Sequence, residues 1–386
     1  MIYLDNAATT PLDEKVFEAM LPYFKQEFGN PSSVHESGRN ARAAIDKARQ
    51  IIASTLNAGP KEIVFTSGAT ESVNAIHKGV VLASTHQVKH IITSAIEHHC
   101  VLDCIEWLGR QGVAVTYVMP DHEGLINPEE VKKAIRPGET ILISIMSANN
   151  EVGTIEPFAE IGRIAKENNI LFHTDAVQGY GKIPIDVQRD HIDFLSVSAH
   201  KIYGPKGAGF FYQRQGVQLV PLVHGGGQES DLRGGTENVA GIVGLAEAAR
   251  LIFERSTERK RLRDLTDLLW KLLKENNPEV VLNGPVASEK RVPGLLNVTF
   301  PGISGEMLVQ SLDGRGFAVS SGAACAAGSA PPSHVLMAMG RSTVEGKQGL
   351  RISLGHSNTE EEIRELVNVL RDAVKKMKTS VSFSDD

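Results

Sequence analysis

Apolar runs and helical patterns alternate along the first part of the chain. Segments such as 140–148 and 193–198 are largely apolar, without the alternation of a half-exposed strand, whereas 69–83 has the spacing of a helix. Strands of this kind are buried on both faces, which is typical of a mostly parallel sheet covered by helices. The pattern predicts an α/β fold. The expected strands are 62–66, 90–93, 113–118, 140–148, 169–175, 193–198 and 207–213, and the expected helices are 13–28, 36–56, 69–83, 98–108, 128–135 and 158–167.

A long helical pattern over 239–276 ends this alternation. Beyond it, short strand-like runs mix with a helix from Gly305 and another over 360–376. A chain of 386 residues is too long for one compact core, so a second domain is expected. We predict a large domain over 13–256, a smaller α+β domain made of 1–12 and 257–378 that carries a cysteine segment at about 320–334, and a polar tail at 379–386.

Composition narrows the class of protein. A hydrophobic content of 41% and a charged content of 22% fit a soluble globular protein, and a net charge of -6 argues against a nucleic-acid partner. The first residues show no signal-peptide pattern, and no apolar stretch approaches the ~20 residues of a membrane span. Three cysteines are too few for a disulfide framework, so we expect the reducing cytoplasm and no membrane partner.

Polar signals fall at the carboxyl ends of four expected strands. They are 67–70, 149–151, Asp175 and 198–201. Ligands of parallel α/β sheets bind at these ends of the strands. Together the four signals predict one polar crevice.

Lys201, in SAHKIYGPKG, follows an expected buried strand. Burial depresses the pKa of a lysine, and a neutral amine can form an imine with a carbonyl. A solvated lysine is the more common case for a single lysine. Ser198 and His200 favour a site, because both are placed to donate to an anion. Lys206 is the rival amine, but it lies in a Gly-Pro-Lys-Gly turn where exposure is more natural.

Asp175 closes the expected strand ILFHTD. A carboxylate there can hold a protonated ring nitrogen, which is the partner that a pyridinium needs to act as an electron sink. Gln178 is close enough in sequence to reach the same ligand. The alternative, equally weighted from this segment alone, is a helix N-cap for residues after Ala176.

The segment SGATES predicts a phosphate site. A glycine joins a strand to a helix, so the free N–H groups at the helix start, at Ala69 and Thr70, and the Thr70 hydroxyl can bind an anion. His98 opens another helix and can stack on a flat ring. Cys100 and Cys104 lie one helical turn apart, so a metal site at this helix competes with the ring-stacking interpretation. In another interpretation, both cysteines are small core residues.

Two further residues carry candidate chemistry in the smaller domain. Arg351, in GLRISLG, can bind a substrate carboxylate across the cleft, although a surface ion pair is about as compatible with the local sequence. Cys325 lies in SSGAACAAGSAPPSHV, where no helical or strand periodicity gives it an apolar face. An accidental exposed cysteine is the alternative to a reactive thiol.

Ten motifs, in order along nearly the whole chain, resemble the cysteine desulfurases of the NifS/IscS type. The motifs are YLDNAATTP, GNPSSVH, FTSGATES, EHH, NNEVG, HTDAVQ, SAHKIYGPKG, RGGTEN, SSGAAC and LRISLGH. The resemblance implies a pyridoxal-phosphate (PLP) enzyme of fold type I in the class V aminotransferase group. It also implies a seven-stranded, mostly parallel sheet in the large domain and a cytoplasmic homodimer.

The resemblance assigns roles to the candidate residues. It implies that Lys201 binds the cofactor as an imine and that Cys325 is the nucleophile, with His98 as a third catalytic residue. The implied cofactor-binding residues are Ala69, Thr70, His98, Asn149, Asp175, Gln178, Ser198, His200 and Lys201, with Thr236 supplied by the other subunit. Arg351 and Asn149 are the implied substrate-binding residues.

The implied reaction converts L-cysteine to L-alanine and holds the sulfur as a persulfide on Cys325. Because that thiol must reach both the enclosed substrate and an outside acceptor, a segment with little packing suits it, and Gly322 and Gly328 supply backbone freedom. The expected acceptor is a scaffold protein of iron–sulfur cluster assembly. No resident metal is expected, although Cys325 is a candidate for a transient iron ligand shared with that scaffold.

Some positions depart from the family pattern. The segment 322–326 is plainer than the usual Gly-Ser-Ala-Cys followed by a hydroxyl residue, 330–332 replaces an often acidic stretch, and Met337 and Gly234 stand where basic and serine residues are common. These departures concern acceptor preference and rate more than chemistry. The alternatives are a selenocysteine lyase or another PLP β-lyase, a class V aminotransferase, and a catalytically silent partner protein.

Overall fold

The structure is a computed structural model of the chain that describes residues 1–321 and 331–382. A seven-stranded sheet forms the centre of the larger part, in the order β2-β8-β7-β6-β5-β3-β4. The strands are β2 Ile63–Thr66, β3 His90–Ser94, β4 Ala114–Val118, β5 Thr140–Ser144, β6 Leu171–Asp175, β7 Phe194–Ser198 and β8 Gly209–Gln213. The prediction of an α/β fold with a mostly parallel sheet is confirmed, with one exception: β8 runs antiparallel to both β2 and β7.

The sheet is buried on both faces because its strands are apolar at successive positions. On β7, Phe194 packs into one buried cluster and Leu195 into another, and on β5 Leu142 and Ile143 divide in the same way. Successive side chains of a strand point to opposite faces, so the two clusters lie on the two sides of the sheet. The uninterrupted apolar runs in the sequence reflect this burial.

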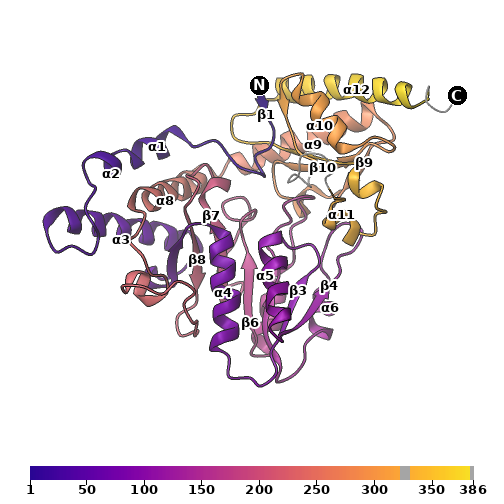
Figure 1. The fold of residues 1–386 in the computed structure, drawn as a ribbon. Helices are drawn as coiled ribbons and strands as arrows, with labels where there is room; N and C mark the ends of the chain where they lie inside the picture. Colours follow the sequence, from indigo (N-terminus) through magenta and orange to yellow (C-terminus); the bar gives the residue numbers. More distant parts are fainter. Residues whose placement is uncertain (322–330, 383–386) are drawn as a thin grey trace.

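Helices cover both faces of the sheet, and Figure 1 shows α4 and α5 side by side over one of them. The helices of this part are α1 Glu14–Met20, α2 Pro22–Lys25, α3 Glu36–Leu56, α4 Ala69–Ala83, α5 His99–Arg110, α6 Pro128–Lys133, α7 Phe158–Glu167 and α8 Val239–Glu254, with 3-10 helices η1 Pro60–Glu62, η2 Ala199–Lys201 and η3 Gln228–Asp231. The expected helix 13–28 is divided at Pro22, which starts α2, because proline cannot continue the hydrogen-bond ladder of the preceding helix.

The smaller part holds an antiparallel sheet, β12-β10-β9, and a parallel pair, β1 with β11. Its strands are β1 Ile2–Tyr3, β9 Val281–Asn283, β10 Leu295–Thr299, β11 Phe317–Ala318 and β12 Gly349–Ser353, and its helices are α9 Glu258–Asn276, α10 Gly305–Asp313, α11 His334–Ala338 and α12 Glu360–Ser382, with η4 Ser288–Lys290 and η5 Glu345–Lys347. The pattern over 239–276 is two helices, α8 and α9, and α12 extends past the expected end near 376 into the region predicted as a polar tail.

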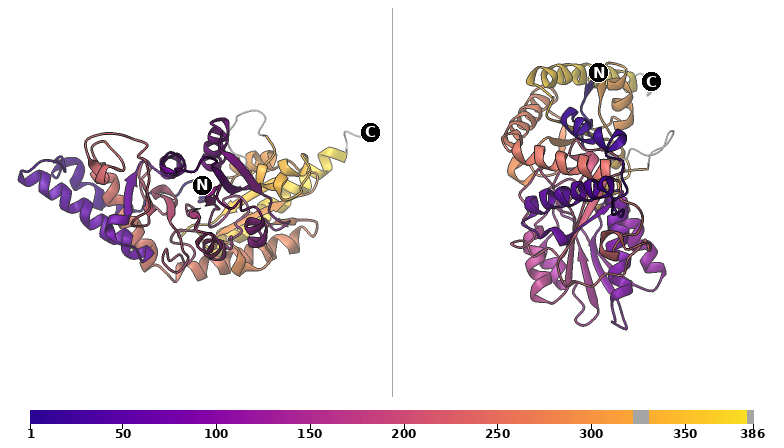
Figure 2. Two further views of the ribbon diagram at one scale, coloured as in Figure 1. Left: turned by 90° about the horizontal axis from the view of Figure 1, so that it is seen from below. Right: turned by 90° about the vertical axis from the view of Figure 1, so that its left-hand side faces the viewer.

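The smaller part is stacked on the larger one, with α12 at the far end of the molecule (Figure 2). Its own buried cluster includes Leu4 from the amino-terminal segment together with Leu296 and Ile352 of the sheet. The chain therefore begins in the smaller part and then crosses to the larger one. Within residues 1–321 and 331–382, no helix is both long and apolar enough to cross a lipid bilayer.

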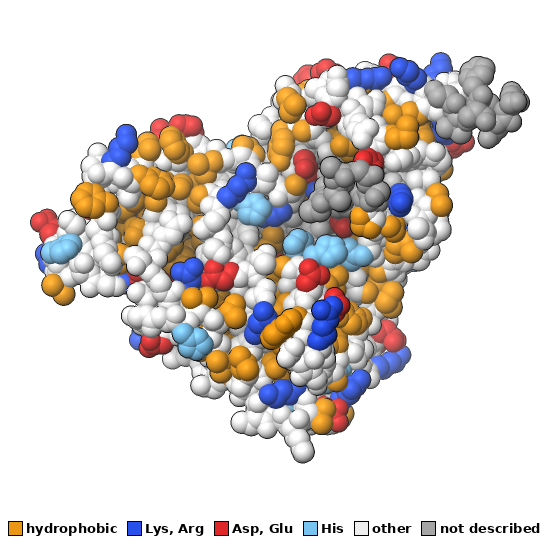
Figure 3. All heavy atoms as spheres, viewed as in Figure 1, with side chains coloured by type: hydrophobic (Ala, Val, Ile, Leu, Met, Phe, Trp, Pro, Cys, Tyr) orange, Lys and Arg blue, Asp and Glu red, His pale blue; other side chains and the backbone are white. Residues whose placement is uncertain are grey.

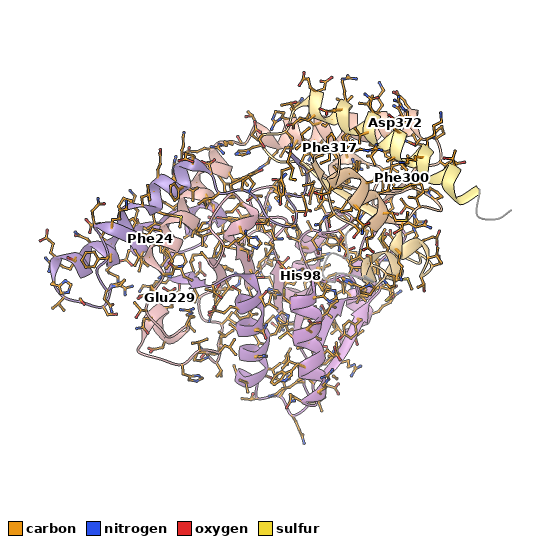
Figure 4. The ribbon with its side chains drawn as sticks, turned by 45° about the horizontal axis from the view of Figure 1, so that its top comes forward. Phe24, His98, Glu229, Phe300, Phe317 and Asp372 are labelled. Atoms are coloured by element: carbon orange, nitrogen blue, oxygen red, sulfur yellow. The ribbon has the colours of Figure 1, made fainter. Side chains whose placement is uncertain are left out.

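A buried ion pair fixes the loop that contains η3. Glu229, labelled in Figure 4, bonds Arg49 at 2.7 Å and accepts the backbone N–H of Phe65 at 2.8 Å. The backbone of Glu229, Ser230 and Asp231 is left-handed, with φ of 48°, 57° and 67°. Such a conformation persists where surrounding contacts enforce it, and the Glu229 carboxylate supplies them here.

We therefore predict that Glu229→Ala lowers the free energy of unfolding by about 3 kcal/mol, because it leaves the Arg49 guanidinium without its buried counter-charge. Urea unfolding followed by circular dichroism measures the change. Glu254→Ala is the matched control, because Glu254 belongs to an exposed pair with Arg250 and its loss is expected to cost less than about 1 kcal/mol. Equal losses in the two variants would show that the Glu229 pair does not hold the loop.

Candidate active site

A cavity of about 720 Å³ lies at the carboxyl ends of the parallel strands, where the smaller part meets the larger one. Figure 3 shows histidine side chains gathered near this junction. Nine of the predicted site residues line the cavity: Ala69, Thr70, His98, Asp175, Gln178, Ser198, His200, Lys201 and Arg351. The structure therefore brings together residues that are far apart in the chain.

Lys201 ends η2, immediately after β7. Its Nζ donates to the carbonyl oxygens of Ala7 and Ala8, both at 2.7 Å. Burial, and after it the positive charge of Arg351, lowers the pKa of Lys201 to about 8, against the opposing charge of Asp175. Near neutral pH this amine is therefore unprotonated far more often than an ordinary lysine, and imine formation requires the unprotonated form.

Asp175 ends β6, the neighbour of β7, and is only 4% exposed. Its Oδ1 accepts the backbone N–H of Val177 at 2.9 Å. Burial raises the pKa of Asp175 to about 6, although the Val177 N–H and the Lys201 charge act in the opposite direction. A carboxylate this deeply buried is poised for a cationic partner in the cavity. The helix N-cap alternative is wrong, because residues 176–182 form turns and no helix.

The turn between β2 and α4 places a helix N-terminus at the cavity. Gly68, with φ of 153°, is its N-cap, and the Ala69 N–H donates to Ser198 Oγ at 2.8 Å. A Cβ at Gly209 would lie 2.6 Å from the Gly68 Cα, so the close approach of β8 to this turn requires glycine. Exposed backbone N–H groups at a helix start bind anions, and Thr70 stands beside them on the cavity wall.

Two histidines in the cavity are held neutral. His98 is the N-cap of α5, and its Nδ1 accepts the backbone N–H of Cys100 at 3.1 Å, so the ring proton is on Nε2. Burial, followed by the charge of Lys201, lowers the pKa of both His98 and His200 to about 4. Figure 4 shows His98 at the end of α5 that faces the smaller part. An uncharged imidazole can lie flat against an aromatic ring without repelling a nearby amine.

The two cysteines of α5 have different surroundings. Cys100 lines the cavity, and burial raises its pKa far above the usual range of a thiol, with Asp175 and Glu97 adding to the effect. Cys104 is 4% exposed and belongs to a buried apolar cluster, which fits the core interpretation. In residues 1–321 and 331–382, no three His, Cys, Asp or Glu side chains are grouped so as to hold a metal ion.

Arg351 on β12 reaches the cavity from the smaller part and is 5% exposed, so the surface ion-pair alternative is wrong. Its Nη1 donates to the carbonyl of Asn150 and its Nη2 to Asp5, both at 2.9 Å. Its Nε is buried and has no hydrogen-bond partner among the described residues. A fixed guanidinium with an unused donor suits a carboxylate ligand.

Three predicted site residues make protein contacts, or lie at positions, that differ from those expected for cofactor-binding residues. Asn149 is fully buried beneath the cavity wall, where its Oδ1 accepts the backbone N–H groups of Glu151 and Val152. Gln178 lines the cavity, but its Nε2 donates to the carbonyl of Ala7 at 2.9 Å. Thr236 is exposed and does not line the cavity of its own chain. Their proposed contacts with a cofactor stay predictions.

Sequence reasoning missed the amino-terminal segment of the site. Asp5 bonds Arg351, and the carbonyls of Ala7 and Ala8 bond Lys201, although the motif YLDNAATTP contains all three residues. Backbone carbonyls leave no signal in side-chain chemistry, so only the motif itself could have indicated them. Glu151, one of the polar strand-end residues predicted to form the crevice, lines the cavity and accepts the Ser333 hydroxyl at 2.5 Å across the two parts.

Cys325 lies outside the described residues. The described residues on either side of its segment are at the cavity: Ser320 pairs with Arg351 through the backbone, and Pro331 and Pro332 line the wall. These positions bear on any role for the thiol, because both ends of its segment are close to the site.

Comparison with known proteins identifies the family. The model of the family described as "Aminotransferase class-V" matches residues 2–366. The chain belongs to the class-V aminotransferase family. The match spans most of both parts of the molecule, so the family fold includes the cavity between them.

Several relatives of this member of the class-V aminotransferase family are named cysteine desulfurases. It is 47% identical to "Cysteine desulfurase IscS" of Dictyoglomus turgidum, with 100% of this chain and 97% of that protein covered. It is 49% identical to the protein of the same name from Methanosarcina thermophila, with 98% and 93% covered. The resemblance to the NifS/IscS type is thereby confirmed.

Solved structures agree with this assignment. A "NIFS-LIKE PROTEIN" superimposes with a TM-score of 0.90 at 40% identity, covering 97% of this chain and 99% of the other. The solved structure "SspA in complex with cysteine" superimposes with a TM-score of 0.81 at 41% identity, covering 92% and 99%. The fold and its two-part arrangement are therefore shared with these proteins.

The residues present fit pyridoxal phosphate, the group that the family implies. The α4 N-terminus suits a phosphate, buried Asp175 suits a protonated ring nitrogen, and Lys201 has a depressed pKa suited to an imine. The cavity volume of about 720 Å³ is within the range of cofactor sites. His98 is placed at the same cavity with a neutral ring.

The raised pKa of Asp175 generates a prediction for the cofactor-free protein. A carboxyl whose pKa rises from 3.8 to about 6 on folding lowers stability as the pH rises through that interval, and the cost is complete above pH 6. Asp175→Asn removes the charge, so we expect it to raise the free energy of unfolding by up to about 3 kcal/mol at pH 8. Near pH 4 the two proteins should be equal.

Thermal unfolding at the two pH values measures this difference. Asp186→Asn is the control, because the pKa of that carboxyl is lowered in the folded protein and its replacement should destabilise at pH 8. An Asp175→Asn variant that is less stable than the native chain at pH 8 would contradict the inferred cost of the buried charge.

Proposed function

We propose that the protein is a PLP-dependent cysteine desulfurase that converts L-cysteine to L-alanine. The observation that carries the proposal is the meeting of the Lys201 amine, the Asp175 carboxylate and the Arg351 guanidinium in one cavity. The names of the relatives, "Cysteine desulfurase IscS", give the reaction class. The similar protein SspA has been solved in complex with cysteine, which supports the substrate class.

Bound PLP supplies an electron sink for the α-carbon of the amino acid. Arg351 binds the substrate carboxylate and fixes its orientation. Lys201, as a free amine, removes the proton from the α-carbon and later returns protons to the product. The neutral ring of His98 packs against the site, with its Nε2 proton available to a substrate atom.

Cys325 is the proposed sulfur acceptor within the protein. Its thiolate forms an S–S bond with the substrate sulfur, while the bond between that sulfur and the β-carbon breaks. The electron pair stays on the β-carbon, which is protonated to give alanine, so no external oxidant or reductant is needed. Pro331 and Pro332 line the cavity, and Ser320 pairs through its backbone with Arg351. These positions support the role, because the residues lie on the two sides of the cysteine segment in the sequence.

The proposal includes a cytoplasmic homodimer and a scaffold protein of iron–sulfur cluster assembly as the sulfur acceptor. Thr236 is exposed and does not line its own cavity, which suits a role in the site of a second subunit. Phe24 and Phe28, which are 63% and 75% exposed, provide apolar surface for such a contact. Transfer to a scaffold would give Cys325 a transient place among the iron ligands.

The test is the position of the sulfur after reaction. We expect the holoenzyme incubated with L-cysteine to carry extra sulfur on the peptide that contains Cys325, as detected by mass spectrometry. Cys325→Ala should lose both the sulfur adduct and alanine formation. Cys104→Ala, which removes a buried thiol of the core, should retain both.

Other outcomes identify the alternatives. Full desulfuration of free L-cysteine by Cys325→Ala would indicate a β-lyase, including a selenocysteine lyase. Consumption of an added keto acid without release of sulfide would indicate an aminotransferase. A purified protein that holds no PLP and is unchanged by borohydride at Lys201 would indicate a silent partner.

The contacts of Arg351 generate a separate prediction. Arg351→Ala should lower kcat/KM for L-cysteine about 10- to 100-fold, because a charge-assisted pair with the carboxylate is lost. Activity on cysteamine, which lacks that carboxylate, should fall much less, because only the effect of the Arg351 charge on the pKa of Lys201 is lost. Arg364→Ala, in an exposed pair with Glu360, is the control for a surface arginine. An equal loss on both substrates would assign Arg351 a structural role.

A further inference from the structure

A row of polar side chains lies directly beneath the cavity, on the face of the large sheet that α4 covers. On β6, Leu171, His173 and Asp175 share one face, because successive side chains of a strand alternate. Asp175 lines the cavity, and Leu171 packs against the apolar cluster that includes Val73 and Ile76 of α4. His173 therefore occupies the level between the site and the apolar core.

The neighbouring strands carry polar residues at the same level. On β7, Phe194 belongs to the same apolar cluster and Ser198 lines the cavity, and Ser196 lies between them on that face. On β5, Ser144 pairs with His173 across the two strands. Ser144, His173 and Ser196 are all fully buried. Three adjacent strands thus present polar groups where the rest of this face is apolar.

A continuous chain of hydrogen bonds joins this level to α4. Ser196 Oγ contacts His173 Nε2 at 3.2 Å, and His173 Nδ1 contacts Ser144 Oγ at 2.8 Å. Ser144 Oγ also contacts His77 Nε2 at 3.0 Å, and His77 Nδ1 contacts the carbonyl oxygen of Val73, one turn back in α4, at 2.8 Å. These four side chains form the buried polar chain: His77, Ser144, His173 and Ser196.

The proton positions of the buried polar chain follow from its end on α4. The Val73 carbonyl can only accept, so His77 Nδ1 carries the ring proton and His77 Nε2 accepts the Ser144 hydroxyl. Ser144 has no second proton to give, so His173 Nδ1 donates to it and His173 Nε2 accepts the Ser196 hydroxyl. Burial lowers the pKa of His77 to about 4 and that of His173 well below its usual range, so both rings are neutral. Every nitrogen of the two rings is therefore used.

Such a chain fixes α4 more narrowly than apolar packing does. Apolar contacts are non-directional, whereas a hydrogen bond requires a defined distance and angle, and a fully satisfied buried network rigidifies its surroundings. The His77 and His173 rings also touch edge to face, with centroids 4.8 Å apart. The same helix begins at the cavity with Ala69 and Thr70, about two turns before His77.

We propose that the buried polar chain positions the N-terminus of α4 so that its N–H groups meet the phosphate group of the cofactor. His77 and His173 are positioning residues, because they act through α4 and β6 and do not line the cavity. The proposal rests on the proposed function, since it takes the phosphate of PLP as the ligand of this helix end. It predicts that breaking the chain weakens binding of the phosphate and largely spares binding of the ring.

The contribution of the phosphate can be isolated by comparing two ligands. Cofactor-free protein is titrated with PLP and with pyridoxal, which has the same ring and aldehyde but no phosphate, and absorbance gives the two Kd values. We expect Ser144→Ala, which interrupts the chain at its centre, to lower the preference for PLP over pyridoxal about tenfold, as for the loss of one hydrogen bond to a charged group. His77→Leu, which detaches α4, should have a similar effect.

His90→Leu is the matched control. His90 is also fully buried, and its two ring nitrogens bond Thr140 and Thr116, both at 2.8 Å. It is the first residue of β3, so it lies at the end of the parallel strands opposite to the cavity. We expect His90→Leu to lose stability and keep the preference for PLP. An equal fall of that preference would overturn the proposal, because general destabilisation would then be the cause.

His173 separates the hydrogen bond from the bulk of the ring. The amide nitrogen of Asn is as far along the side chain as Nδ1 of His, so His173→Asn keeps a donor for Ser144, whereas His173→Leu keeps only bulk. We expect the preference for PLP to fall about tenfold in His173→Leu and to stay close to native in His173→Asn. Equal falls in the two variants would contradict a role for the hydrogen bond.

Two further outcomes would overturn the proposal. One is a parallel loss of affinity for PLP and pyridoxal, which would indicate a distorted cavity, and the other is a native preference in both Ser144→Ala and His77→Leu. These variants break the chain at different points, so a folding defect in one leaves the other as the test. The titrations involve neither turnover nor Cys325. A protein that binds PLP as expected but transfers no sulfur from L-cysteine would contradict the proposed function alone.

Discussion

The site depends on keeping an amine and a carboxylate buried at the ends of two adjacent parallel strands. Lys201 follows β7 and Asp175 ends β6, so the sheet fixes both groups at the same cavity wall. Each charge is costly away from water, and the folded protein shifts both pKa values toward the neutral forms. Part of this cost is offset because each group stabilises the charge of the other, while the rigid sheet fixes both positions.

The amino-terminal segment joins the two parts around this pair. Leu4 is buried in the smaller part, and Ser353 of β12 accepts the Ala7 backbone N–H at 2.9 Å. In the same segment, the carbonyls of Ala7 and Ala8 accept the Lys201 amine. A displacement of the smaller part would therefore change the contacts of the Lys201 amine, and through Asp5 those of Arg351 as well.

Much of the fold could be predicted from the sequence, because buried strands and helices have recognisable patterns of apolar residues. Apolar runs located the strands of the large sheet within a few residues, and helix α3 was predicted with the bounds that the structure has. The antiparallel direction of β8 was not accessible, because a buried strand is apolar whichever way it runs. The break between α8 and α9 was also missed, since residues 255–257 contain no glycine or proline to mark it.

For the candidate site, residue type and strand ends indicated that Lys201 and Asp175 belong to one crevice, and both line the cavity. The local sequence left Arg351 open between a substrate contact and a surface ion pair, and only the family resemblance placed it at the site. Contacts made by the backbone were not predictable in this way. The surroundings of Asn149 show why: a fully buried amide can serve a turn of the chain instead of a ligand, and its residue type is the same in either case.

The charged groups around the cavity also determine how readily a thiol ionises at each position in it. Cys100 is in the cavity, yet burial and then the carboxylates of Asp175 and Glu97 hold it in the unreactive thiol form. A thiol that approaches from the Arg351 side instead meets a guanidinium whose Nε is unused by the described residues. Positive charge favours a thiolate, and only a thiolate attacks sulfur efficiently. The charges around the cavity therefore disfavour ionisation of Cys100, and they would favour it for a thiol placed beside Arg351.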